Sequence, residues 1–172
     1  KTKLLEKYFK GIVQTNPQFL SMYYGDELGN FIMAKEMPDH SFSIQRITRK
    51  GKKAKIIWEH ENKKWFEEKN FQIEILASED AYNPKMRPWY KEALASKTHA
   101  WTDVYVFFSD RKPGITCSRA VYDKTGKFIG VLGIDISILE LSQFLSTIKI
   151  GTNGKVFLLD SKNQLVAIPS SD

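Results

Sequence analysis

The segment from Tyr82 to Tyr90 combines one fixed cation with several aromatic side chains. Arg87 presents a planar set of donors that matches a carboxylate through two parallel hydrogen bonds. Trp89, Tyr90 and Tyr82 can supply apolar walls and further donors. Aromatic residues at a helix start are also common in protein cores, and an arginine there often pairs with a local acid. The residue types alone therefore leave two interpretations open, a small-anion site and a structural cluster.

The prolines around Arg87 predict how it is placed. Asn83-Pro84 is typical of a turn, and Pro88 suits the first position of a helix that we predict over residues 88–96. A residue that precedes proline is disfavoured in helical geometry. We therefore expect Arg87 to be extended and to lie beside the free N–H groups and positive dipole end of that helix, a corner that favours anions.

Asp135 is the acid of an otherwise apolar strand predicted over residues 128–136. Side chains alternate along a strand, so Val131, Gly133 and Asp135 share one face. The missing side chain at Gly133 predicts a gap beside the carboxylate. A buried carboxylate without a partner costs several kcal/mol, so Asp135 needs either a donor from the protein or a ligand. Two alternatives follow: a direct ion pair with Arg87, or a guest held between the two groups.

The rest of the pattern predicts an α+β chain whose antiparallel sheet is flanked by helices. Residues 104–108 form a predicted strand in which Tyr105 and Phe107 share one face, as either pocket wall or core. Ser137 is expected to cap a helix that ends near Ile148. The other predicted elements are a helix over 4–13, a hairpin over 20–34, strands at 42–47, 56–58, 71–75 and 115–122, and a final hairpin over 156–168.

Composition narrows the classes of function. With 172 residues, 42% of them hydrophobic, the chain is long enough for one main domain with a real core. It contains no run of about 18 apolar residues, so we expect any membrane segment to lie outside this chain. Cys117 is the single cysteine, so no internal disulfide can form. The three histidines lack metal-ligand spacing, and no phosphate loop or nucleophile elbow is present, so we expect no catalytic residues, no metal and no cofactor.

The net charge of +6 includes one dense basic cluster between Arg46 and Lys55. Such a cluster can bind nucleic acid or anionic lipid. It also brackets Gly51 between two strand-like runs, which is typical of a solvated hairpin tip. We favour the hairpin tip and expect no nucleic-acid partner, with a basic surface-binding module as the alternative.

Four motifs follow one another in the second half of the chain. They are Tyr82-x4-Arg87-x-Trp89-Tyr90, then Trp101-Thr102-Asp103-x-Tyr105, then Gly130 to Ile136, and finally Lys149 to Gly154. In this order they resemble the double Cache sensor domain, an extracytoplasmic ligand-binding module of many bacterial and archaeal transmembrane receptors. The first half is similar to that family only in its layout of a helix followed by strands.

The resemblance implies two PAS-like units hung from a long N-terminal helix. Residues 1–136 would form the membrane-distal unit, 137–150 a connecting helix and 151–172 the start of a truncated membrane-proximal unit. It also implies a homodimer through the N-terminal helix, attachment to the membrane through segments outside this chain, and an output domain elsewhere, such as a kinase, a cyclase or a chemotaxis module. A structural Cache domain without a ligand is the remaining alternative.

In amino-acid-binding members of that family, the positions matching Arg87 and Trp89 hold the ligand carboxylate. Asp135 matches an acid that takes the ammonium, and the wall positions are Tyr82, Tyr90 and Tyr105. The chain departs from the pattern at Phe107, where those members carry a second acid. Losing one charge-assisted hydrogen bond is worth about 1.5 to 3 kcal/mol, or roughly ten- to a hundredfold in affinity. The expected ligand is therefore an amino acid or another small carboxylate. The alternatives to an amino acid are a carboxylate without an amine and a larger apolar ligand that packs on Phe107.

Overall fold

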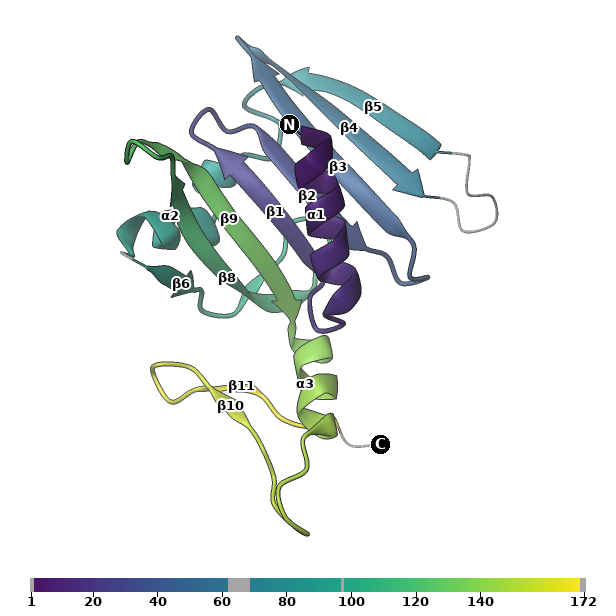
Figure 1. The fold of residues 1–172 in the computed structure, drawn as a ribbon, viewed down its shortest axis with the longest axis vertical. Helices are drawn as coiled ribbons and strands as arrows, with labels where there is room; N and C mark the ends of the chain where they lie inside the picture. Colours follow the sequence, from purple (N-terminus) through teal and green to yellow (C-terminus); the bar gives the residue numbers. More distant parts are fainter. Residues whose placement is uncertain (1, 62–68, 97, 171–172) are drawn as a thin grey trace.

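The computed structural model describes residues 2–61, 69–96 and 98–170. In this part of the chain a nine-stranded sheet has the order β5-β4-β3-β2-β1-β9-β8-β6, and β7 pairs with β8 (Figure 1). All of its strand pairs are antiparallel. The strands of this sheet are β1 (Ser21–Asp26), β2 (Phe31–Glu36), β3 (Phe42–Lys50), β4 (Lys53–Glu61), β5 (Lys69–Ala77), β6 (His99–Trp101), β7 (Tyr105–Val106), β8 (Pro113–Tyr122) and β9 (Phe128–Ser137).

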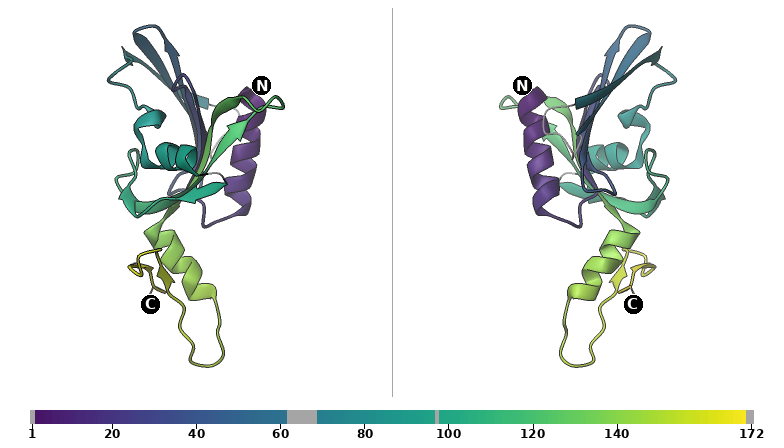
Figure 2. Two further views of the ribbon diagram at one scale, coloured as in Figure 1. Left: turned by 90° about the vertical axis from the view of Figure 1, so that its left-hand side faces the viewer. Right: turned by 90° about the vertical axis from the view of Figure 1, so that its right-hand side faces the viewer.

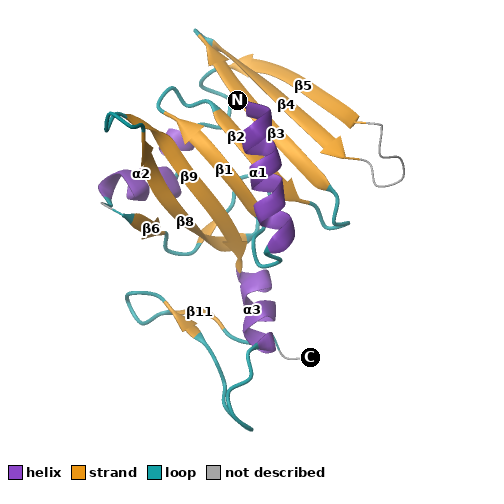
Figure 3. Ribbon diagram, viewed as in Figure 1, coloured by secondary structure: helices purple, strands orange, loops and turns teal. Residues whose placement is uncertain are grey.

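Helices cover the two faces of the sheet, which confirms the predicted α+β class (Figures 2 and 3). On one face, α1 (Thr2–Thr15) buries Phe9 and Val13 against Met22, Ile32 and Ile44. This matches the helical spacing of its apolar residues. The opposite face packs against the short helices η1 (Pro84–Met86) and α2 (Pro88–Ala95) and the segments around them. The sheet thus separates α1 from the aromatic segment that the sequence singled out.

Helix α3 (Ile138–Thr147) leads away from the end of β9 (Figure 1). Ser137 caps it as predicted, since its hydroxyl oxygen accepts from the N–H of Glu140 at 3.2 Å. The short strands β10 (Leu158–Leu159) and β11 (Leu165–Ala167) form a separate hairpin beside α3. A small apolar cluster joins the hairpin, α3 and the sheet through Ala167, Leu145 and Ile136.

The strand predicted over residues 104–108 is shorter in the structure. Only Tyr105 and Val106 pair with β8, because the backbone turns after them. The turn is closed by two hydrogen bonds, from the N–H of Phe107 to the Lys112 carbonyl at 2.9 Å and from the N–H of Arg111 to the Phe107 carbonyl at 3.1 Å. Strand β6, which the sequence did not indicate, pairs with another part of the same edge of β8.

Candidate functional site

A cavity of about 580 Å³ lies on the face of the sheet opposite α1. Its floor consists of strands β1 to β5 and β9, and its other walls come from the segments around residues 80–89 and 105–111. The structure brings most of the sequence-predicted site residues together here. Those that line the cavity are Tyr82, Arg87, Trp89, Tyr105, Phe107 and Asp135.

Arg87 has the predicted geometry. It precedes α2 with extended backbone angles of φ −86° and ψ 150°, and Pro88 follows at the first helical position. Its guanidinium carbon lies 6.0, 5.9 and 5.7 Å from the ring centres of Tyr82, Tyr105 and Phe108. Its hydrogen bond, from Nη2 to the Val106 carbonyl, is long at 3.5 Å. Within the described ranges Arg87 has no acidic partner, so its donors remain available to an anion.

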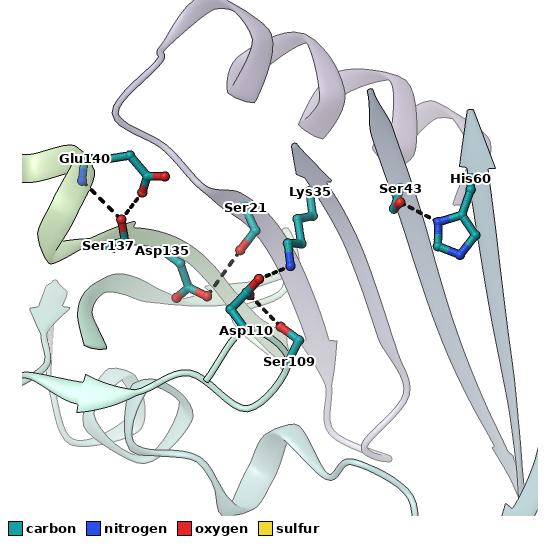
Figure 4. Close-up of polar contacts among 9 residues, drawn as sticks. All are labelled: Ser21, Lys35, Ser43, His60, Ser109, Asp110, Asp135, Ser137 and Glu140. Atoms are coloured by element: carbon teal, nitrogen blue, oxygen red, sulfur yellow. Dashed lines mark hydrogen bonds and ion pairs between the residues drawn. The ribbon is translucent and has the colours of Figure 1, made fainter. Parts of the chain in front are cut away.

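Asp135 is only 8% exposed and has protein donors. Its Oδ1 accepts from the Tyr23 hydroxyl at 2.5 Å and the Thr116 hydroxyl at 2.6 Å, and its Oδ2 accepts from Ser21 at 3.2 Å (Figure 4 shows the Ser21 bond). Burial raises the pKa of Asp135 to about 6, although the hydrogen bonds counteract this. Among the described residues Asp135 forms no ion pair, so the direct pairing with Arg87, one of the two alternatives, is not seen.

The predicted gap at Gly133 is occupied, and that expectation was wrong. The Tyr23 ring lies over Gly133 so closely that a Cβ atom there would overlap it. Gly133 therefore makes room for a ring of the neighbouring strand β1 rather than for a ligand. Burial also raises the pKa of Tyr23 well above its usual value, so the phenol stays protonated and donates to Asp135.

The register of the sheet arranges the cavity floor in rows. Residues directly opposite one another on neighbouring strands point to the same face. One row, which we call the polar row, crosses six strands and consists of His60, Ser43, Lys35, Ser21, Asp135 and Thr116. Figure 4 shows most of its members. Four positions further along the strands, a row of apolar character consists of Ile56, Ile47, Phe31, Gly25, Val131 and Ala120. The floor thus changes from polar to apolar along the cavity.

Lys35 is buried in the polar row at 8% exposure and forms an ion pair with Asp110 of the turn after β7 (Figure 4). The Ser109 hydroxyl donates to the second oxygen of Asp110 at 2.9 Å. Asp110 also lies close enough to Asp135 for its negative charge to contribute to the raised pKa of that carboxyl. The sequence did not indicate this pair, because each residue follows an apolar run and has the pattern of a solvated strand end or turn.

Two predicted wall residues, Tyr90 and Trp89, make hydrogen bonds within the protein. Tyr90 does not line the cavity, since its hydroxyl donates to the Asp26 carbonyl at 3.0 Å and its ring packs on Phe128. Trp89 does line the cavity, but its indole N–H donates to the Tyr82 hydroxyl at 3.2 Å. Trp89 and Tyr82 therefore hold each other in place as parts of one wall.

Phe107 is at once cavity wall and core. It is 2% exposed, packs edge to face on Tyr105 with ring centres 5.3 Å apart, and lies over Gly114, where a Cβ atom would overlap it. The ring fills the position at which the amino-acid-binding pattern carries its second acid. No charge is therefore supplied from this position.

The basic cluster is divided between internal and exposed roles. Arg46 donates to Glu6 at 2.6 Å and to Glu59 at 2.7 Å. Arg49 donates to the carbonyl of Tyr82 at 2.7 Å and so fixes the loop that carries this wall residue. Exposed lysines remain at the β3–β4 turn, which has Gly51 at φ 58° as a hairpin tip predicts. Because the two arginines make contacts within the protein, fewer exposed cations remain for binding nucleic acid or anionic lipid than the sequence alone indicated.

In the described part of the chain, no helix is long and apolar enough to span a membrane. Nor do the described residues gather three or more potential ligands for a metal ion.

Comparison with known proteins points to one family. The family described as Cache domain matches residues 1–172. Among characterised proteins, methyl-accepting chemotaxis protein McpG of Pseudomonas putida is 27% identical over 93 residues, which is 54% of this chain and 14% of that protein. McpB of Bacillus subtilis is 34% identical over 89 residues, or 51% of this chain and 13% of that protein. The chain thus corresponds to a small part of these receptors.

Solved structures share the fold. The ligand-binding domain of Campylobacter jejuni chemoreceptor Tlp3 in complex with L-valine aligns with a TM-score of 0.60 at 24% identity, covering 99% of this chain and 56% of that one. The ligand-binding domain of Pseudomonas fluorescens chemoreceptor CtaA in complex with L-serine aligns with a TM-score of 0.54 at 22% identity, covering 96% of this chain and 62% of that one. At these identities the similarity establishes the shared fold only. The ligand of this chain therefore has to be inferred from its own residues.

Proposed function

The chain belongs to the Cache domain family, and from that premise we propose that it is the small-molecule sensing domain of a transmembrane signalling receptor. The observation that carries the proposal is Arg87, whose guanidinium faces a cavity of about 580 Å³ and has no acidic partner in the described residues. A half-buried cation of this kind favours an anionic ligand, because a carboxylate supplies both the missing charge and two well-aligned acceptors.

The ligand class that this cavity supports best is an amino acid or another small carboxylate. The carboxylate would bind Arg87, with Tyr82, Trp89 and Tyr105 as walls. The apolar end of the floor would receive the body of the molecule. Amino acids are also what the matched Tlp3 and CtaA domains carry in their structures.

The layout of the receptor is part of the proposal. Residues 1–136 form the membrane-distal unit, 137–150 the connecting helix and 151–172 the start of the proximal unit, all on the outer side of the membrane. Helix α1 exposes Leu4 and Tyr8, at 74% and 64%, on the side away from the sheet. These side chains lie one helical turn apart and support pairing of two N-terminal helices in a dimer.

A thermal-shift screen tests the binding function. Amino acids, plain carboxylates and amines would be added to the wild type and to Arg87→Ala, with Arg119→Ala as a control because Arg119 is exposed on β8 and outside the cavity. A carboxylate at 100 times its Kd should stabilise the wild type and the control by about 2.7 kcal/mol. Arg87→Ala should fold but lose this response. If no compound stabilises the wild type, or if Arg87→Ala responds equally, the chain is a structural Cache domain or uses another site.

A further inference from the structure

The charges inside the cavity do not all need a ligand. Asp135 accepts hydrogen bonds from three hydroxyl groups, and Asp110 is paired with Lys35. The remaining acids at the cavity, Glu74 and Asp80, are exposed to solvent at its rim. Both acids at the polar end therefore have internal partners.

The cations differ in the same respect. Lys35 is paired, and Arg111 is exposed with its guanidinium 5.5 Å from the centre of the Phe108 ring. Arg87 is half-buried and contacts three rings and one distant carbonyl, but it has no acid in the described residues. Among the described residues, Arg87 is thus the half-buried cation of the cavity that has neither an acid nor a set of close acceptors, and a monoanion would supply both.

Lys35 occupies a particular place in this arrangement. In the polar row it stands directly opposite Ser21, which in turn stands opposite Asp135. With strands about 4.8 Å apart, Lys35 and Asp135 are therefore only about 10 Å apart at the backbone. Asp110 does not itself line the cavity, but its carboxylate binds the Lys35 ammonium (Figure 4), and its charge also acts on Asp135.

We propose that Lys35 determines ligand specificity, because its ammonium supplies, from within the chain, the cation that neutralises Asp110, an acid with which the ammonium of an amino acid could otherwise pair. The inference rests on the proposed function and narrows it. The favoured ligand is a carboxylate without an α-ammonium and with an apolar body that lies along Met33, Phe31 and Ile56. An incoming ammonium would lose its hydration and find Asp110 already neutralised and Asp135 already hydrogen-bonded.

Matched ligands separate the two classes. L-leucine and 4-methylpentanoate share a carbon skeleton and differ by the ammonium. In calorimetric titrations at pH 7, 4-methylpentanoate should bind the wild type at least about tenfold more tightly than L-leucine, because a charged group buried without a partner costs at least this much affinity. Tighter binding of L-leucine would overturn the inference and leave the proposed function intact. If the wild type binds neither probe and no other carboxylate, both fail together.

Substitutions test the role of Lys35. Lys35→Met leaves Asp110 without its cation, so the affinity ratio should move about tenfold or more toward L-leucine. Lys112→Met is the control, since Lys112 is exposed on the same turn and outside the cavity, and it should keep the wild-type ratio. An unchanged ratio in a folded Lys35→Met variant would contradict the assignment.

A second variant keeps the test decisive if Lys35→Met does not fold. Asp110→Asn retains the shape of the side chain and leaves the Lys35 ammonium unneutralised. The extra positive charge should move the ratio further toward 4-methylpentanoate, by about tenfold. A ratio that stays the same or moves toward L-leucine would show that the Lys35–Asp110 pair does not set specificity.

Discussion

The surroundings of two charged groups that line the cavity, Arg87 and Asp135, are built in different ways, and we call them the open end and the completed end. The guanidinium of Arg87 is surrounded by three rings and has no acidic partner among the described residues. The carboxylate of Asp135 accepts three hydrogen bonds from hydroxyl groups of its own chain. The difference shows that a cation and an acid in one cavity do not by themselves define a site for a zwitterion. The donors of Arg87 are available to a ligand, whereas the oxygens of Asp135 already accept hydrogen bonds from the protein.

The largest expected effect concerns the pH dependence of stability. Burial raises the pKa of Asp135 to about 6, so the folded carboxyl keeps its proton at pH values where the unfolded one, near its usual 3.8, has lost it. This contribution to stability is complete below about pH 4 and is lost as the pH rises through about 6. Between pH 4.5 and 7.5 it amounts to about 2 kcal/mol.

Urea unfolding of the wild type and of Asp135→Asn at these two pH values measures the effect. Stability of the wild type should fall by about 2 kcal/mol more than that of the variant. Equal pH dependence in the two chains would mean that the pKa of Asp135 is not raised in the folded state, which would contradict the description of a buried acid without an ion-pair partner.

Tyr23→Phe tests how the acid end is completed. The change removes one of the three donors to Asp135 and should lower the free energy of unfolding by about 1.5 kcal/mol. Carboxylate affinity should change by less than about threefold, because the anion binds at the other end. Tyr122→Phe is the control, since Tyr122 is 55% exposed. A large loss of carboxylate affinity in Tyr23→Phe would show that the two ends act as one.

Arg87→Lys tests the geometry at the open end. Lysine keeps the charge but has no planar pair of donors, so carboxylate affinity should fall by about tenfold, which is about 1.4 kcal/mol. Stability should remain within about 0.5 kcal/mol of the wild type, since Arg87 makes few bonds within the protein. Titration calorimetry provides the affinity. Unchanged affinity would indicate a simple point-charge interaction in place of a bidentate one.

Tyr90→Phe should have the smallest effect on binding. The hydroxyl of Tyr90 donates to the Asp26 carbonyl and lies outside the cavity lining. Its loss should lower stability by about 1 kcal/mol and leave carboxylate affinity within about twofold of the wild type. A tenfold loss of affinity would show that the ligand reaches Tyr90, as the family resemblance implies.

Local rules were sufficient to predict the open end. Asn83-Pro84 and Pro88 determine the backbone on both sides of Arg87, and the structure has the extended geometry that they predict. Alternation along β9 likewise placed Asp135 on the cavity face. The family was identified from ordered motifs, and the family match over the whole chain confirms it.

The surroundings of Asp135 could not be predicted from local rules, because they depend on contacts between residues that are far apart in the sequence. Tyr23 reaches Asp135 from 112 positions away, and the same ring occupies the space that Gly133 leaves. Lys35 and Asp110 are 75 positions apart and meet only because a turn replaces the second half of the predicted strand over 104–108. Sequence reasoning recognised that the acid needed donors, but the identity of the donors depends on strand register.

The most direct test of the central claim is a crystal structure of this chain with 4-methylpentanoate bound. The carboxylate should lie about 2.8 Å from the guanidinium nitrogens of Arg87, while Lys35 remains paired with Asp110 and Asp135 keeps its hydroxyl donors. A carboxylate bound to Lys35 instead, with Arg87 turned toward a protein acid, would contradict the account.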